Sequence, residues 1–156
     1  MAKVDKQEEV SNLCQSLFSL MGVKTQAEVT FDKDNNTYLV ALPKSEESGL
    51  LIGKRGETIS SLQTLLGVML QIGTGEWSRI IVNVGDWREK QEDYLKNLAD
   101  NIAQKVKESD QEQPIYNLNP GQRRIIHLEL SQDPELETES FGEGTDRYLV
   151  VRLKKK

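Results

Sequence analysis

The sequence predicts an α+β protein built from two small domains. Segments with the apolar spacing of a helix are interspersed with short segments in which apolar and polar residues alternate, as they do in half-buried strands. The first half runs helix, strand, strand, short helix, glycine loop, helix and strand, an order typical of helices packed over one small sheet. With 156 residues, of which 37% are hydrophobic, the chain can form one ordinary domain or two small ones.

Composition and charge exclude several classes of protein. The formal net charge is −5, whereas proteins that bind polyanions over their whole surface are usually basic. The single cysteine, Cys14, cannot form an internal disulfide, and the N-terminal residues lack the apolar run of a signal peptide. No segment approaches the roughly 18 consecutive apolar residues that a membrane span requires. We therefore expect a cytoplasmic protein without a membrane span.

The first domain is expected to span residues 1–85 and to begin with a helix and a hairpin. Apolar residues at helical spacing predict a helix over residues 7–21, which stops at Gly22. Alternating residues on either side of the turn-rich "DKDNN" predict a β-hairpin over residues 27–42.

The remainder of this domain surrounds a glycine loop. A short apolar helix is expected to end at Gly53, and a longer helix follows Gly56 and runs to the glycines at 73 and 75. The sequence "SRIIVNVG" predicts a third strand. The longer helix should carry its apolar face on Ile59, Leu62, Leu66 and Met69.

The second domain is expected to span residues 86–156, including the long helix with which it begins. Asp86 is a candidate N-cap, and Glu89 completes a capping box. The helix should end near Ser109. Its buried stripe is expected to be Leu95, Leu98, Ile102 and Val106.

A loop, a second helix and two strands should complete this domain. The polar stretch "SDQEQP" predicts a loop, and Asn119 and Pro120 provide the cap and first residue of a helix. Residues 136–141 and 147–153 are candidate strands.

The stretch "GLLIGKRGETI" places Lys54 and Arg55 between Gly53 and Gly56. It does not fit a P-loop, because Gly49 and Gly53 are separated by three residues rather than four and an arginine follows the lysine. It does not fit a dinucleotide-binding fingerprint either, since no strand leads directly into it. A plain turn and a main-chain grip for phosphates remain as alternatives.

For the grip, glycines without Cβ atoms would let a sugar–phosphate backbone approach the main chain. Amides at the start of the next helix, together with Lys54 and Arg55, would face the phosphates. Ile52 and Ile59 would wall an apolar groove for the bases. The plain turn stays open, because two glycines at this spacing arise easily by chance.

Arg123 and His127 form the second candidate site. They are four residues apart on a predicted helix and so share a face, where they could contact a phosphate and stack on a base. The alternative is a histidine that fills the edge of the core beside Ile126 and Leu128. His127 is the only histidine, and no serine or cysteine is spaced to act as its nucleophile. We therefore expect no enzymatic activity, no metal and no cofactor.

The motif "IGKRGETI" within its order of elements resembles a KH domain of the bacterial type II arrangement (α-β-β-α-α-β), over about residues 7–85. The resemblance implies a module that clamps about four nucleotides of single-stranded RNA or DNA at the glycine loop. Lys54 and Arg55 fit a loop that keeps this activity.

The stretch "NPGQRRIIHLELSQDPELETESFGEG" resembles the small α+β domain named R-three-H for its Arg-x-x-x-His spacing, which is associated with single-stranded nucleic acids. A KH domain followed directly by this domain resembles the bacterial Jag family, also called SpoIIIJ-associated or KhpB proteins. The resemblance implies a cytoplasmic RNA-binding protein that acts after transcription, with links to cell shape and division. It also implies a homodimer or a heterodimer with a small KH-only protein.

The sequence thus predicts a binder of single-stranded RNA, with single-stranded DNA as a second ligand. A protein-interaction or ribosome-associated scaffold with residual nucleic-acid affinity is the alternative. The residues predicted to contact RNA are Ile52, Gly53, Lys54, Arg55, Gly56, Ile59, Arg123 and His127.

Overall fold

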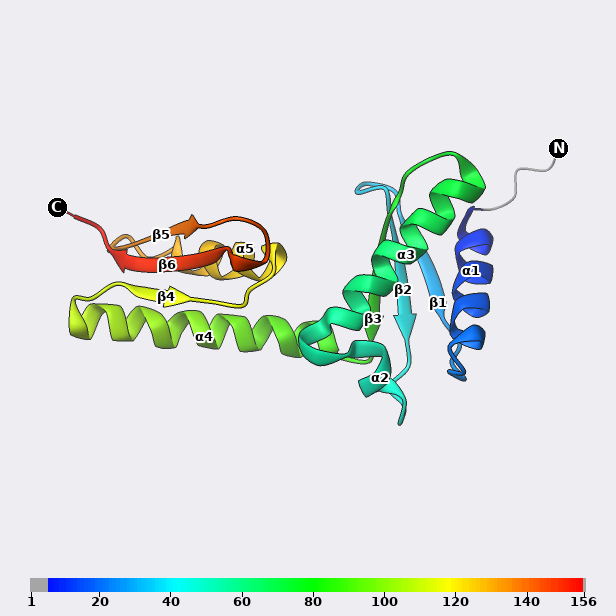
Figure 1. Ribbon diagram of the computed structural model, residues 1–156, viewed down its shortest axis with the longest axis horizontal. Helices are drawn as coiled ribbons and strands as arrows, with labels where there is room; N and C mark the ends of the chain where they lie inside the picture. The colour runs from blue at the N-terminus through cyan, green and yellow to red at the C-terminus, as the bar shows by residue number, and fades with distance from the viewer. Residues whose placement is uncertain (1–5, 156) are drawn as a thin grey trace. The chain divides into compact units, whose positions relative to one another are not determined.

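The computed structural model describes residues 6–155, which form two compact units divided between Arg88 and Glu89 (Figure 1). Each unit combines helices with a three-stranded sheet and has a hydrophobic core of its own. The predicted α+β class is confirmed. The domain boundary expected between residues 85 and 86 stays a prediction, because helix α4 (Trp87–Ser109) begins before the division and continues through it.

The sheet of the first unit has the strand order β1-β2-β3. Strand β1 (Glu28–Asp32) pairs antiparallel with β2 (Thr37–Leu42), and β2 pairs in parallel with β3 (Arg79–Val84). Helix α1 (Lys6–Leu20) packs against β1, and α3 (Glu57–Thr74) packs against β3 and α1 (Figure 1). These elements lie where the apolar spacing predicted them.

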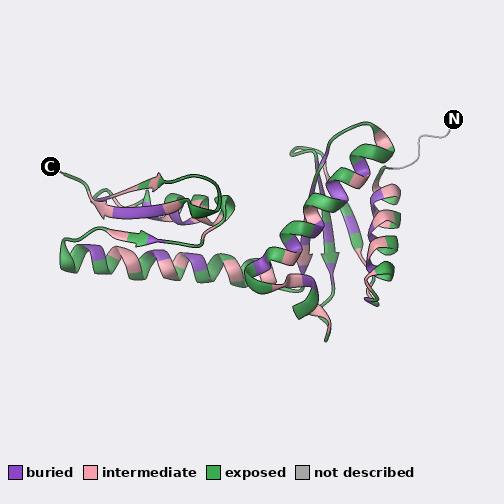
Figure 2. Cartoon of the chain, viewed as in Figure 1, coloured by how far each residue is buried: buried purple, intermediate pink, exposed green. Residues whose placement is uncertain are grey.

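The core of this unit lies between the helices and the sheet (Figure 2). From α1 it receives Val10, Cys14 and Phe18, which are spaced four residues apart and share one face. In α3 the predicted stripe needs one correction. Leu70 is 1% exposed and takes the core position expected for Met69, which is only half-buried, because Leu70 lies four residues after the buried Leu66.

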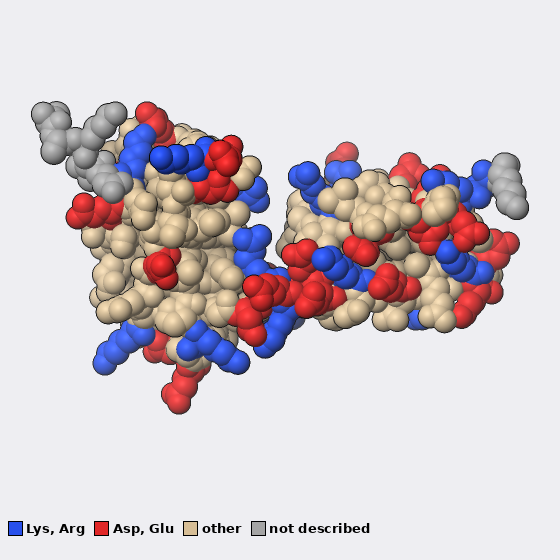
Figure 3. Space-filling model, turned by 180° about the vertical axis from the view of Figure 1, so that it is seen from behind, with Lys and Arg blue, Asp and Glu red and all other residues tan. Residues whose placement is uncertain are grey.

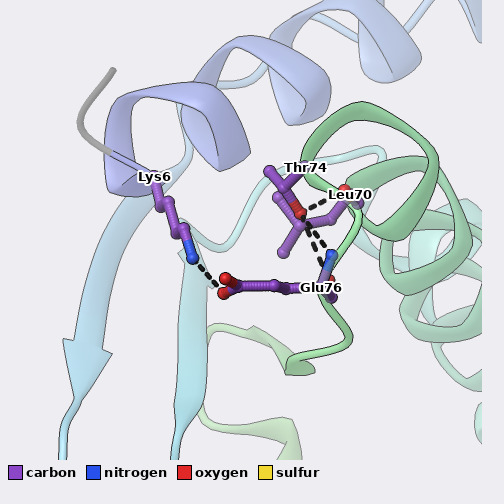
Figure 4. A network of polar contacts seen from close by, with 4 residues as sticks. All are labelled: Lys6, Leu70, Thr74 and Glu76. Carbon is purple, nitrogen blue, oxygen red and sulfur yellow. Dashed lines mark hydrogen bonds and ion pairs between the residues drawn. The ribbon is translucent and has the colours of Figure 1, made fainter. Parts of the chain in front are cut away.

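The C-terminal end of α3 is closed by local hydrogen bonds (Figure 4). Gly75 adopts a left-handed φ of 75°, and the hydroxyl of Thr74 donates to the carbonyl of Leu70 at 2.8 Å. Glu76 then forms an ion pair with Lys6, which lowers the pKa of the Glu76 carboxyl. Both charged side chains are exposed, so the pair contributes little to the stability of the fold.

The second unit begins with α4 and contains an antiparallel sheet. Its strands are β4 (Gln113–Ile115), β5 (Leu136–Phe141) and β6 (Tyr148–Leu153), in the order β4-β6-β5. Helix α5 (Pro120–Leu130) packs against β5 (Figure 1). Buried residues of α4 and α5 meet the inner face of the sheet in one core.

Strand β4 was not predicted, because most of it falls in the stretch expected to be a loop. Its Pro114 cannot donate a backbone hydrogen bond, and the strand lies at the edge of the sheet, where proline is tolerated. Ile115 is 7% exposed and joins the core. Pairing with β6 therefore imposes a strand where local composition indicates none.

The start of α5 confirms its predicted cap. The side-chain oxygen of Asn119 accepts a hydrogen bond from the Gln122 amide at 2.9 Å, and the Gln122 side chain accepts one from the Asn119 amide at 2.9 Å. Pro120 occupies the first turn of the helix, where a backbone N–H has no acceptor within the helix. The N–H group that proline lacks therefore costs no hydrogen bond. The cap predicted at Asp86 for α4 stays a prediction.

Candidate nucleic-acid interface

The glycine loop joins α2 (Ser48–Ile52) to α3 through a single 3-10 turn. Gly53, Arg55 and Gly56 all have positive φ angles, of 71°, 54° and 79°. In a residue with a side chain, the left-handed conformation costs roughly 1–2 kcal/mol. Its presence at Arg55 shows that the surrounding structure enforces the shape of the loop, as often occurs at binding sites.

Both glycines are required by the protein's own packing. A Cβ atom on Gly53 would lie 2.1 Å from the Oγ1 atom of Thr58, and one on Gly56 would lie 2.5 Å from the Cη2 atom of Trp87. A side chain at either position would therefore point toward the protein, whereas from the sequence we expected the glycines to make room for a ligand. Any larger residue at either position would push the loop away from the side chains against which it packs.

The loop amides fall into two groups. The Gly53 amide donates to the Gly49 carbonyl at 2.9 Å, and the Gly56 amide donates to the Gly53 carbonyl at 3.4 Å. The amides of Lys54 and Arg55 are the first two of the 3-10 turn, where an N–H group has no acceptor within its own turn. These two amides can therefore donate to an anion outside the loop.

The charged side chains of the loop are exposed. Within residues 6–155, neither Lys54 nor Arg55 forms an ion pair, so both charges can meet a ligand. On the face shown in Figure 3, acidic and basic side chains are interspersed over each unit rather than gathered into one basic surface. The loop is therefore a local source of positive charge on an acidic protein.

The two isoleucines predicted to wall a groove differ in burial. Ile52 is half-buried beside the loop and has surface to offer a base. Ile59 is only 3% exposed and lies in the core, so its side chain supports α3 from beneath and does not reach a base on the surface. Helical spacing alone could not distinguish these two environments.

The second candidate site is a pocket of about 510 Å³ beside α5 and β5. Arg123 is held in place by its own hydrogen bonds, because its Nη1 atom donates to the carbonyl of Leu118 at 2.6 Å and to that of Arg147 at 3.3 Å. The charged and polar residues that line it are Arg123, Arg124, His127, Thr138, Glu139, Ser140 and Arg147. The Glu139 carboxylate is paired with Arg152.

His127 lines this pocket and is exposed, so it is not a core residue. Its neighbour Ile126 is fully buried and fills the core position instead. The Nδ1 atom of His127 shares a hydrogen bond with the Thr138 hydroxyl, which orients the ring and leaves Nε2 as the nitrogen available to a ligand.

Sequence reasoning missed the rest of the pocket. Thr138 and Ser140 alternate with outward-facing residues along β5, and Arg147 immediately precedes β6. The alternation in β5 was a usable signal, whereas the approach of Arg147 to Arg123 depends on the fold. The role of Trp87 beneath Gly56 likewise has no local signature.

Residues 6–155 contain neither a metal-binding cluster nor a membrane-spanning helix. No group of three or more His, Cys, Asp or Glu residues among them is placed to hold a metal ion. No helix in this part of the chain combines the length and the apolar character needed to cross a membrane.

The two units match two known domain families. Residues 7–82 match the family described as KhpA/KhpB, KH domain, and residues 93–153 match the R-three-H domain. Both resemblances inferred from the sequence are confirmed. These are binding domains rather than catalytic ones, which agrees with the expected absence of enzymatic activity.

Curated relatives align with most of the chain. RNA-binding protein KhpB of Clostridium symbiosum is 32% identical over 149 residues, covering 96% of this chain and 67% of that protein. RNA-binding protein KhpB of Bacillus subtilis (strain 168) is 28% identical over 155 residues, covering 98% of this chain and 73% of that protein. The chain belongs to the KhpB family.

Proposed function

We propose that this chain binds single-stranded RNA in the cytoplasm and acts as a post-transcriptional regulator. The observation that carries the proposal is the conformation of the glycine loop. Arg55 is held with a φ of 54° between two closely packed glycines. This turn carries two amides with no acceptor in the turn and two exposed cations that form no ion pair within residues 6–155. The relatives named above, which are RNA-binding proteins, support the same function.

At the loop, the RNA backbone is the chemically matched ligand. The amides of Lys54 and Arg55 would donate to one phosphate, and their side chains would neutralise that phosphate and its neighbour. Ile52 offers apolar surface to a base, while the buried Ile59 keeps α3 in place. A net charge of −5 then restricts binding to the loop and the pocket rather than to the surface as a whole.

At the pocket, Arg123 would act as a preorganised contact. Its guanidinium is already fixed by two carbonyl oxygens, so little side-chain freedom is lost when it meets a phosphate. Arg124 and Arg147 add charge, and the Nε2 atom of His127 adds a donor or an acceptor. Two weak sites on one chain reinforce each other when one RNA reaches both.

A protein-interaction or ribosome-associated scaffold is the second candidate function. It is favoured by an apolar stripe on the outer face of α3, where Leu65, Val68 and Ile72 are 45%, 41% and 81% exposed. A second copy of the chain or a small KH-only protein would fit this face. The scaffold differs from the RNA binder in requiring no charge on the glycine loop.

A titration of labelled single-stranded RNA across salt concentrations tests the proposed function. When a protein neutralises phosphates, the logarithm of the binding constant falls with the logarithm of the salt concentration, with a slope of about −0.7 for each phosphate contact. The double variant Lys54→Asp/Arg55→Asp should weaken binding and reduce the slope, without a change in melting temperature because both side chains are exposed.

The matched control is Lys33→Asp/Arg79→Asp, which changes the net charge by the same amount. Lys33 lies in the β1–β2 turn and Arg79 begins β3, at the opposite end of the sheet from the β2 end that leads to α2. It should retain affinity. Equal losses in both double variants would show that net charge, not the loop, governs binding, and no RNA binding by the unmodified chain would favour the scaffold.

A further inference from the structure

Three aromatic side chains lie in one row across the sheet of the second unit. Tyr148 begins β6 and is paired in register with Phe141, the last residue of β5. Tyr116 directly follows β4, and its ring contacts that of Tyr148. The ring centroids are 5.0 Å apart for Tyr116 and Tyr148, and 6.0 Å apart for Phe141 and Tyr148. We call these three residues the aromatic row.

The aromatic row lies on the face of the sheet that points away from the core. Leu149 and Val151 are 2% and 0% exposed and pack with the helices, so alternation places Tyr148 and Arg152 on the opposite face. Tyr116 remains 58% exposed and Phe141 37% exposed. Aromatic surface is therefore open to solvent on this face of the sheet.

The geometry of the rings determines which faces are free. The interplanar angles are 37° for Tyr116 with Tyr148 and 31° for Phe141 with Tyr148, so neighbouring rings are closer to parallel than to perpendicular. At these separations the rings are in contact and tilted against one another. The outer faces of the end rings, Tyr116 and Phe141, are the ones that a further ring could cover.

The Phe141 end of the aromatic row lies next to the pocket of the second candidate site. Strand β5 is an edge strand, and its Thr138 and Ser140 line the pocket while Phe141 points to the other face. Arg147, which also lines the pocket, immediately precedes Tyr148 of the aromatic row. Strand β5 alone therefore separates the arginines of the pocket from the exposed face of the Phe141 ring.

The charges around the aromatic row favour a base over a phosphate. Arg152 donates to the carboxylates of Glu137 at 2.6 Å and of Glu139 at 2.9 Å, so the two acids on this face are paired. The connection between β5 and β6 carries Glu143 and Asp146, which would repel a phosphate. An uncharged ring system suits this face, while the phosphates suit the pocket, where Arg123, Arg124 and Arg147 outnumber Glu139, whose carboxylate is paired with Arg152.

We propose that the Phe141 end of the aromatic row stacks against one base of an RNA strand whose phosphates contact Arg123, Arg124 and Arg147. This inference rests on the proposed RNA-binding function and adds a base-binding subsite to it. Stacking is tolerant of sequence, because every base has a π-face. The contrasting role is purely structural, with the rings serving only as cross-strand pairs that stabilise the sheet.

The substitution Phe141→Leu tests the proposal in the RNA titration. Loss of one base–aromatic stack should weaken binding by about 5- to 150-fold. The salt slope should not change, because stacking neutralises no phosphate. Arg147→Gln should instead weaken binding and reduce the slope by about 0.7, which separates the two kinds of contact.

Phe31→Leu is the matched control. Phe31 forms a cross-strand aromatic pair with Tyr38 in the first unit, at a centroid distance of 4.6 Å, and lies on an edge strand as Phe141 does. It should leave affinity unchanged. Should Phe141→Leu also leave affinity unchanged while Arg147→Gln weakens binding, the aromatic row is structural and the proposal is overturned.

Ultraviolet crosslinking of the unmodified protein to uridine-rich RNA gives a measurement that needs no variant. A base stacked on Phe141 should yield a nucleotide adduct on the peptide that contains this residue, located by mass spectrometry. Adducts elsewhere in the chain with none on this peptide would overturn the subsite. A chain that binds no RNA at all would instead overturn the proposed function, and the two failures are thereby distinguished.

Discussion

The indole of Trp87 packs against Gly56, and a Cβ atom on that glycine would lie 2.5 Å from the Cη2 atom of the ring. Trp87 is the first residue of α4 and is half-buried against the core of the first unit. The shape of the glycine loop therefore depends on a side chain far from it in the sequence. The packing of Trp87 against Gly56 is as much a part of the candidate site as the side chains of Lys54 and Arg55.

Gly56→Ala should destabilise the chain by more than the cost of its backbone conformation. Alanine at a φ of 79° costs roughly 1–2 kcal/mol, and the clash with Trp87 adds to that cost. Chemical denaturation should show this loss, and RNA affinity should fall because the loop moves. Gly75→Ala is the control, since Gly75 has a φ of 75° but a Cβ atom there would meet nothing within 4 Å. Equal losses in the two variants would show that Trp87 does not restrict the loop.

Trp87→Ala should weaken RNA binding through the loop. Removing this half-buried ring should lower the free energy of unfolding by about 2 kcal/mol, less than the roughly 3–5 kcal/mol of a fully buried aromatic residue. In the Lys54→Asp/Arg55→Asp background it should cause no further loss of affinity, because the contacts it supports are already gone. Additive losses in this double-mutant cycle would assign Trp87 a role apart from the loop.

Trp77→Ala is the matched control for that experiment. The Trp77 ring also covers a glycine, since a Cβ atom on Gly67 would lie 3.2 Å from its Cη2 atom, but the contact lies in the middle of α3. Affinity should persist in this variant when it is measured well below its melting temperature.

The sequence was sufficient for features that depend on neighbouring residues. Helical spacing located α1 and α3, and Asn119 with Pro120 located the start of α5. Features that require two distant segments were not predictable in this way. Strand β4 exists because it pairs with β6, and the aromatic row exists because of the register between strands.

The candidate site shows the same division. The order of glycines and cations in the loop is local, so Lys54 and Arg55 could be named from sequence, and the structure places both at the surface. The burial of Ile59 depends on how α3 is rotated over the sheet, and helical spacing does not give that rotation. Arg147 reaches Arg123 only because β6 begins beside α5.

Thr138→Val should weaken RNA binding without altering the pocket's shape or charge. Valine keeps the volume of threonine but cannot bond to the Nδ1 atom of His127, so the ring loses its fixed orientation. Ordering one side chain on binding corresponds to a loss of about 2- to 10-fold in affinity. Thr30→Val is the control, because it makes the same exchange at an exposed position of strand β1, outside the pocket. Unchanged affinity in both variants would exclude a role for the orientation of His127.

Asn119→Ala should lower the free energy of unfolding by about 1 kcal/mol. The substitution removes the side-chain acceptor of the Gln122 amide and leaves a helix-terminal N–H without its partner. Gln122→Ala removes only the reciprocal bond to the Asn119 amide and should be milder. Thermal denaturation of both variants would measure the difference, and an equal loss would contradict the assigned roles in the capping box.

Cys14 should make the chain less stable at alkaline pH. Burial raises the pKa of its thiol to about 12, and the side chain is 0% exposed. The unfolded state ionises near its ordinary pKa of about 9 while the folded state does not, so stability is complete below about pH 9 and declines toward pH 12. The decline should not exceed about 1.4 kcal/mol per pH unit. Cys14→Ala keeps every lysine and tyrosine, so its curve should fall less steeply over the same range, and parallel curves would show that the thiol does not titrate between the two states.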